Sequence, residues 1–152
     1  MKSLKISFQN FCKINNFELN PNQIEIVNAL KDFLYPEKKI FNLLFKKKNS
    51  LCFYLSGSVG VGKTMILNFV FESISFSKKK FHFNEFMIQF HDFRHKMKKE
   101  NKKNSINNFV KKLKKFRLIY LDEFQVTNIV DAMILGKLFE VIFSENIKII
   151  IT

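Results

Sequence analysis

The stretch LCFYLSGSVGVGKT, residues 51–64, decides the fold. Its first part, Leu51–Leu55, is a short apolar run without polar alternation, which is typical of a strand buried on both faces of a parallel sheet. Its second part, Gly57–Thr64, matches the phosphate-loop pattern GxxxxGK[ST]. Apolar residues then recur at helical spacing over Met65–Ser73. This order of strand, glycine loop and helix predicts the core of a phosphate-loop nucleoside triphosphatase.

Each residue of the loop has an expected part in binding ATP and Mg²⁺. The glycines let successive backbone N–H groups face one concavity, and the following helix N-terminus adds partial positive charge. Lys63 is expected to reach the β- and γ-phosphates and to act in catalysis, while the Thr64 hydroxyl is a predicted Mg²⁺ ligand. The predicted cofactor-binding residues are Gly57, Ser58, Val59, Gly60, Val61, Gly62, Lys63 and Thr64. A chance glycine-rich turn is the alternative, and the flanking strand and helix argue against it.

A second motif supplies carboxylates. The apolar run Leu118–Leu121 predicts a strand, and Asp122 and Glu123 follow it, Asp122 standing 59 residues after Lys63 (122 − 63). This is the Walker B pattern, in which Asp122 would hold Mg²⁺ and Glu123 would activate the attacking water as a catalytic base. Open parallel sheets bind ligands at the carboxyl ends of their strands, which fits this position. The alternative is an ordinary surface turn.

The rest of the chain alternates helices and strands. Further elements are predicted at Asn22–Leu34, Phe81–Phe83, Asn84–Lys98, Ile106–Lys114, Ile129–Phe143 and Ile147–Ile151, of which the second and the last are strands. The alternation predicts the α/β class: a three-layer, AAA+-like parallel sheet with helices on both faces and right-handed crossovers. We expect residues 21–152 to form the ATPase core and residues 1–20 a segment of unknown role. The chain ends at Thr152 directly after a strand, so we expect the sheet to be incomplete there.

The charge does not by itself indicate a partner. The net charge is +13, from 26 basic and 13 acidic residues, and the lysines fall in separate runs along the chain. A nucleic-acid site more often combines Arg with interleaved aromatic residues in one element. Solvated faces are the expected interpretation, with a weak, salt-sensitive attraction to polyanions, and nucleic acid is not an expected partner.

Cysteine and histidine usage favours no metal centre. Cys12 and Cys52 lack metal-ligand spacing and are expected to be reduced and structural. His91 and His95 are four residues apart, as zinc ligands on a helix could be, but no HExxH pattern or cysteine pair accompanies them. No uninterrupted apolar stretch approaches about 18 residues, so we expect a cytoplasmic protein without a transmembrane segment.

Three blocks together resemble a specific family. They are YLSGSVGVGKTMILNFVF at Tyr54–Phe71, KKFHFNEFMIQFH at Lys79–His91, and LIYLDEFQVTNIVDAMILGKLFEVIF at Leu118–Phe143. The chain is similar, from about Gln23 to Thr152, to the ZapE cell-division ATPases of bacteria and their mitochondrial, AFG-one-like relatives in the AAA+ class.

The resemblance implies an ATPase with ATP bound at Gly57–Thr64, magnesium at Asp122 and water activation by Glu123. It also implies a role in cell division through the FtsZ ring at the cytoplasmic side of the membrane, or in the mitochondrial matrix for a eukaryotic relative. A homo-oligomer and peripheral membrane association are compatible with it. In the family, the strand matching Ile147–Ile151 continues into Thr-Ser-Asn, and an arginine finger lies further on. Here Thr152 is the last residue, so nucleotide binding is expected more firmly than turnover.

Two alternatives stay open. One is a truncated nucleotide-binding module without turnover. The other is a DNA-associated, helicase-loader-like ATPase, which the net charge and the phosphate loop favour but the HFNEFM and DEFQVT blocks do not.

Overall fold

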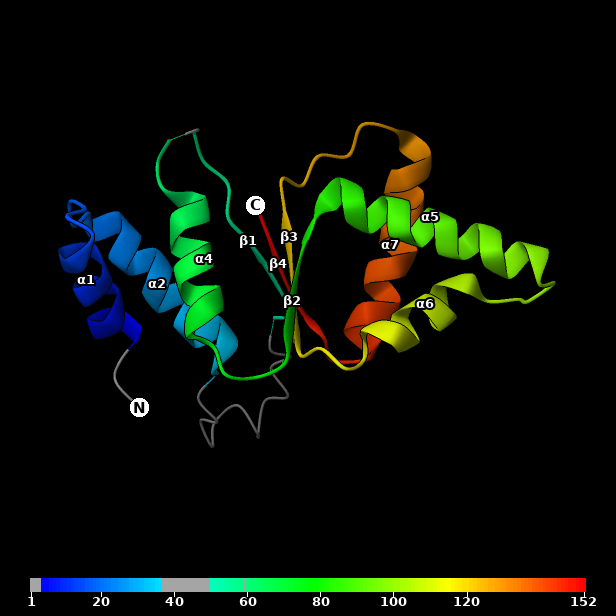
Figure 1. The fold of residues 1–152 in the computed structure, drawn as a ribbon, viewed down its shortest axis with the longest axis horizontal. Coiled ribbons are helices and arrows are strands. Elements are labelled where there is room, and N and C mark those ends of the chain that lie inside the picture. The colour runs from blue at the N-terminus through cyan, green and yellow to red at the C-terminus, as the bar shows by residue number, and fades with distance from the viewer. Residues whose placement is uncertain (1–3, 37–49, 59) are drawn as a thin grey trace. The chain divides into compact units, whose positions relative to one another are not determined.

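The computed structural model describes residues 4–36, 50–58 and 60–152. The chain divides into two compact units, Met1–Ser75 and Phe76–Thr152 (Figure 1). The domain division expected from the sequence, with an ATPase core over residues 21–152, stays a prediction. Val59 of the predicted loop and the basic run Lys46–Lys48 lie outside the described residues.

The first unit contains three helices and one strand among its described residues. Their bounds are α1 Leu4–Ile14, α2 Pro21–Leu34, β1 Cys52–Tyr54 and α4 Lys63–Ser73. Helix α2 begins where capping chemistry predicts, because the Asn20 side chain accepts a hydrogen bond from the Asn22 N–H at 2.9 Å and Pro21 occupies the first turn. The predicted helices here are therefore confirmed, with starts one or two residues earlier.

Helix α1 was not predicted. Phe8 and Cys12, one helical turn apart, are fully buried, and the Phe8 ring meets the Phe69 ring of α4 at a centroid distance of 5.2 Å. A second α1 ring, Phe11, lies 5.0 Å from Phe69. An 11-residue helix is marginal alone, so this segment depends on packing against α4 that its own sequence does not reveal.

The strand β1 is present where expected, but one part of the prediction is wrong. A strand buried on both faces was expected, whereas Tyr54 is 64% exposed and Cys52 and Phe53 are half-buried. An apolar run indicates extended backbone but does not indicate whether both faces are covered.

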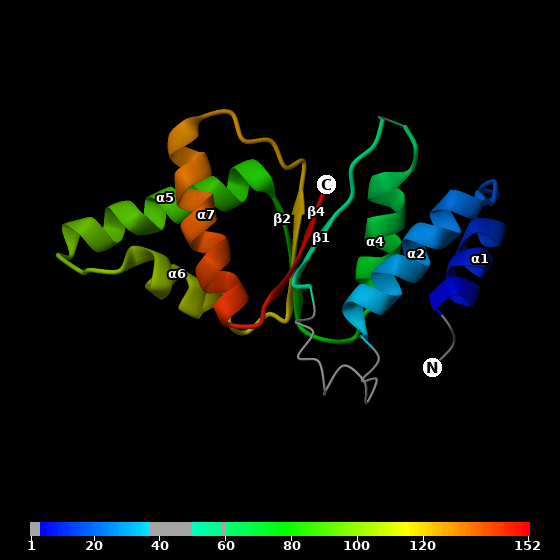
Figure 2. The same cartoon turned by 180° about the vertical axis from the view of Figure 1, so that it is seen from behind.

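The second unit is built on three parallel strands. Its elements are β2 Lys78–His82, α5 Phe83–Lys99, α6 Ser105–Leu113, β3 Leu118–Asp122, α7 Ile129–Ser144 and β4 Lys148–Ile151. Strand β3 lies between β2 and β4 and pairs parallel with both. All five β3 residues are buried, and α5, α6 and α7 lie together on one side of these strands (Figures 1 and 2). The predicted α/β class with a parallel sheet is confirmed.

Strand β2 corrects a second prediction. The sequence placed a strand at Phe81–Phe83, whereas the strand runs from Lys78 to His82 and Phe83 opens α5. The lysines at 78–80, interpreted as a solvated run, pair with Leu118, Ile119 and Tyr120 of β3. Long lysine stems can cover apolar surface while the ammonium reaches a polar partner, so charge did not exclude a strand.

The cysteines and the lengths of the helices bear on two further expectations. Cys12 and Cys52 are free thiols, as expected from their spacing. None of the helices in residues 4–36, 50–58 and 60–152 is long and apolar enough to cross a membrane.

We predict that Phe8→Ala lowers the free energy of unfolding by about 3–5 kcal/mol, because it removes a fully buried ring from the contact with Phe69. Urea denaturation followed by circular dichroism measures the loss. Ile14→Ala is the matched control on the same helix, since Ile14 is 81% exposed and its truncation should change stability by less than about 0.5 kcal/mol. Equal effects of the two changes would show that α1 does not dock as described.

Candidate functional site

The glycine loop leads directly into the N-terminus of α4. Gly60 and Gly62 have positive φ angles of 87° and 82°, which glycine adopts without a steric penalty. Gly62 is the N-cap residue of α4, and no side chain caps the helix there. The first N–H groups of a helix lack partners within the helix. This N-terminus therefore offers backbone donors and a partial positive charge to an anion.

Lys63 folds back over the loop. Its Nζ donates hydrogen bonds to the carbonyl oxygens of Gly57 at 2.6 Å and Ser58 at 2.7 Å. These bonds place the ammonium against the backbone at the start of the loop. The side chain predicted to bind phosphate is thus already positioned beside the loop.

Gln23 of α2 braces the other side of the loop. Its Nε2 donates to the Val61 carbonyl oxygen at 3.3 Å, and a Cβ atom on Gly62 would come within 2.9 Å of the same Nε2. Gln23 could not be identified from the sequence, because no local pattern connects a glutamine on α2 with a loop residue 38 positions later.

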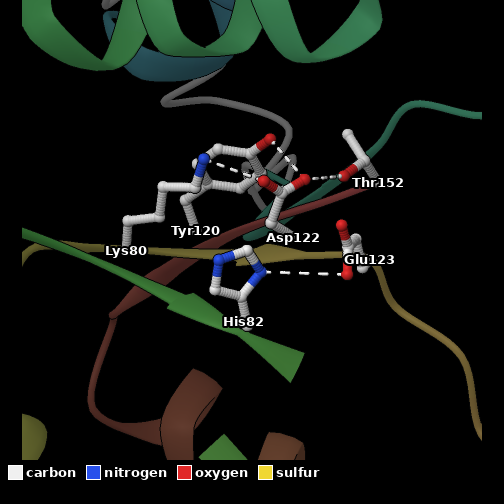
Figure 3. Close-up of polar contacts among 6 residues, drawn as sticks. All are labelled: Lys80, His82, Tyr120, Asp122, Glu123 and Thr152. Atoms are coloured by element: carbon white, nitrogen blue, oxygen red, sulfur yellow. Dashed lines mark hydrogen bonds and ion pairs between the residues drawn. The ribbon is translucent and has the colours of Figure 1, made fainter. Parts of the chain in front are cut away.

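The predicted carboxylate Asp122 lies at the end of β3 and is 5% exposed. Its Oδ1 accepts hydrogen bonds from Tyr120 Oη at 2.9 Å and from Thr152 Oγ1 at 2.8 Å. Its Oδ2 forms an ion pair with Lys80 Nζ at 2.8 Å. Figure 3 shows the side chains of Lys80, Tyr120 and Thr152 converging on this carboxylate.

The parallel register explains how three strands reach one carboxylate. Lys80 of β2 pairs with Tyr120, which lies two residues before Asp122 and on the same face of β3. On the other side, Leu121 pairs with Ile151, and the Thr152 N–H bonds to the Leu121 carbonyl at 3.2 Å. Thr152 therefore lies beside Asp122. The sequence did not identify Lys80, Tyr120 or Thr152 as site residues. The sequence of one strand does not show how it aligns with its neighbours, so the pairing that brings these side chains together could not be predicted.

These contacts shift the pKa of Asp122. Burial alone would raise the pKa of the carboxyl, but hydrogen bonds from Lys80, Thr152 and Tyr120 outweigh it and hold the pKa below its usual value. Burial raises the pKa of the Tyr120 phenol, which therefore stays protonated as a donor. Asp122 is an anion at neutral pH, as a metal ligand must be.

Glu123 differs from Asp122 in its exposure and in its partners. Its side chain is 79% exposed, and the nearest ion-pair partner is His82, whose Nδ1 lies 3.9 Å from Oε2. Its φ angle is 57°, a left-handed conformation that costs a residue with a Cβ about 1–2 kcal/mol. The turn is held by the Phe124 N–H, which donates to the Thr152 carbonyl at 2.7 Å.

Each unit contains an oxygen donor of the kind that a hard cation prefers. In the second unit this is the Asp122 carboxylate, and in the first unit it is the Thr64 hydroxyl on the first turn of α4. Mg²⁺ is commonly bound by one or two carboxylates with waters and substrate phosphates. Within the described residues no three His, Cys, Asp or Glu side chains gather closely enough to hold a metal ion by themselves. His91, considered as a zinc ligand, instead contacts the Asp131 carboxylate at 2.9 Å.

We predict that Gly62→Ala destabilises the protein by about 1–2 kcal/mol or more, because a Cβ there adopts a left-handed conformation and meets Gln23. Gly136→Ala is the matched control, since a Cβ at this position in α7 would meet nothing within 4 Å. An alanine in a helix interior should stabilise by up to about 1 kcal/mol. Thermal melts of both variants test the difference, and two shifts of the same sign would contradict it.

We also predict an acid-dependent contribution from Asp122. Its pKa is lower in the folded than in the unfolded state, so its contribution to stability is fully present above about pH 4 and is lost as pH falls through the folded-state value. Urea unfolding of the wild type and of Asp122→Asn at several pH values measures it. The stability difference between the two should shrink below about pH 4, and a difference independent of pH would contradict the assignment.

Comparison with known proteins gives the family. The AFG1-like ATPase family model matches residues 14–152. Lactation elevated protein 1 homolog B of Danio rerio is 35% identical over 111 residues, which are 66% of this chain and 22% of that protein. Cell division protein ZapE of Escherichia coli K12 is 29% identical over 101 residues, 65% of this chain and 26% of that protein.

The chain thus spans about a quarter of the length of these relatives. No solved structure matches it. The family model covers nearly the whole sequence and includes both the glycine loop and the carboxylates. The chain belongs to the AFG1-like ATPase family.

Proposed function

We propose that this chain binds MgATP at Gly57–Thr64 and hydrolyses it with Glu123 as the base. The observation that carries the proposal is the glycine loop at the uncapped N-terminus of α4, in a chain of an ATPase family. An uncapped helix end with adjacent loop N–H groups is a general phosphate-binding arrangement.

Lys63 is the residue whose contacts change on binding. Its ammonium now bonds the Gly57 and Ser58 carbonyls. A phosphate oxygen is a charged acceptor and so a stronger one than a neutral carbonyl. We infer that Lys63 exchanges these carbonyls for the β- and γ-phosphates.

Asp122 and Thr64 are the proposed protein ligands of Mg²⁺. When bound, the ion would neutralise charge that develops on the phosphate oxygens. Asp122 is suited to this role because its anionic form is favoured and its position is fixed by Tyr120 and Thr152. Glu123 is suited to the different role of accepting a proton from water, because its side chain is exposed and its ion-pair contact with His82 is long, at 3.9 Å.

For the cellular role, we propose an action in cell division through a protein partner, FtsZ, in the cytoplasm. Support comes from the similarity to a protein named cell division protein ZapE. For a eukaryotic source, the corresponding proposal is the mitochondrial matrix. A nucleotide-binding module without turnover and a DNA-dependent ATPase are the competing functions. Stimulation of phosphate release by FtsZ but not by DNA would favour the first proposal.

We predict that Lys63→Ala weakens ATP binding by about 10–100-fold, because it removes charge-assisted hydrogen bonds to phosphate. Glu123→Gln should bind MgATP normally and lower the rate of phosphate release by about 10²–10⁴-fold. Calorimetry and a phosphate-release assay measure the two quantities.

Lys111→Ala is the control for the loss of one positive charge, since Lys111 lies exposed on α6. It should leave both quantities unchanged. Normal ATP affinity in Lys63→Ala would exclude the loop as the binding site. Binding by the wild type without any phosphate release would favour the module without turnover.

A further inference from the structure

We propose that Lys80 is a built-in counter-cation of Asp122 which Mg²⁺ must displace, so that Lys80 sets the Mg²⁺ affinity of the site. The inference rests on the proposed function, in which Asp122 binds Mg²⁺. It assigns a positioning role to a residue outside both motifs.

The two oxygens of the Asp122 carboxylate have different partners. Oδ1 already accepts two hydrogen bonds, from Tyr120 at 2.9 Å and Thr152 at 2.8 Å. Oδ2 faces Lys80 Nζ at 2.8 Å. A carboxylate oxygen offers about two acceptor sites, so the capacity that remains for a metal ion or its water is on Oδ2. That oxygen is the one held by the ammonium.

A dication and an ammonium on the same oxygen repel one another. The side chain of Asp122 is only 7% exposed, so water screens this repulsion less than it would at the surface. Mg²⁺ therefore binds favourably only when Lys80 withdraws from Oδ2. Mg²⁺ therefore competes for Oδ2 with the Lys80 ammonium, whose effective concentration at this oxygen is set by the fold.

The structure provides a way for Lys80 to withdraw. The backbone of Lys80 is fixed in β2 opposite Tyr120, but its side chain is 29% exposed and flexible. Its Nζ already lies 4.8 Å from the centroid of the Tyr120 ring, which can hold a cation by its π face. A change of side-chain rotamer would move the ammonium off the carboxylate without moving the strand.

The pairing also explains why a buried carboxylate is tolerated when no metal is bound. A buried charge without a partner strongly destabilises a fold. Lys80 supplies the missing positive charge in the metal-free protein, and Mg²⁺ supplies it in the bound protein. The site is therefore occupied only above the Mg²⁺ concentration at which the ion outcompetes Lys80 for Asp122.

The test uses the full chain and Mn²⁺, a paramagnetic substitute for Mg²⁺, titrated by EPR with ADP at saturation. Lys80→Met keeps the length of the side chain and removes the charge. We expect Mn²⁺ to bind about tenfold tighter or more. We also expect a melting temperature below that of the wild type without metal, with the gap narrowing when metal is added.

Lys79→Met is the matched control. Lys79 is the neighbouring strand residue and its Nζ lies over the Phe81 ring at 5.6 Å, away from Asp122. It removes the same net charge, so unchanged Mn²⁺ affinity in this variant excludes a general electrostatic effect. If Lys80→Met does not fold, Lys80→Gln replaces it, because glutamine keeps a donor for Oδ2 without the charge.

The Asp122→Asn variant distinguishes failure of the proposed metal site at Asp122 from failure of the proposed role of Lys80. Loss of Mn²⁺ binding in Asp122→Asn, with unchanged or weaker binding in the Lys80 variant, overturns the inference but leaves the proposed metal site standing. Unchanged Mn²⁺ binding in Asp122→Asn overturns both. Tighter binding in the Lys80 variant and its loss in Asp122→Asn is the result that supports the inference.

Discussion

The buried carboxylate of Asp122 is the constraint on which the second unit depends. Its partners come from three strands: Lys80 from β2, Tyr120 from β3, and Thr152 directly after β4. A shift of either neighbouring strand by one residue would turn Lys80 or Thr152 to the opposite face of the sheet. An uncompensated buried charge costs several kcal/mol. Burial of apolar side chains alone would be compatible with several strand registers. The ion pair and the hydrogen bonds to Asp122 therefore select one of them.

The glycine loop of the first unit is organised by a different kind of interaction. Its shape is set by the backbone, with glycines at positive φ and the Lys63 ammonium on two carbonyl oxygens. Gln23 reaches it from a distant element, α2. Because the interactions are mostly local, the loop sequence carries most of the information about its own conformation. The carboxylate cluster is the opposite case, since its geometry exists only after β2, β3 and β4 have paired.

This contrast explains what could be predicted from the sequence. Strand β3 and helices α2, α4 and α7 follow from apolar spacing, and the loop and carboxylates follow from short motifs, because each pattern is local. Lys80 could not be identified, because a lysine in a basic run looks the same whether it is solvated or paired with Asp122. Helix α1 was missed since its folding depends on Phe69 in another element. The start of β2 was missed because its lysines resemble a loop.

The backbone at Glu123 gives a separate argument about its role. Among the described residues other than glycine, positive φ occurs at four asparagines, Asn16, Asn101, Asn104 and Asn146, and at Glu123. Asparagine tolerates this conformation because its short side chain can bond locally, whereas glutamate bears the full steric cost. A glutamate in that position therefore contributes something other than stability. The turn that imposes the strain also brings its carboxylate to the carboxyl end of β3, next to Asp122 and exposed to water. Strain of this kind is common where a side chain is held for chemistry, and it supports the proposal that Glu123 acts as the base.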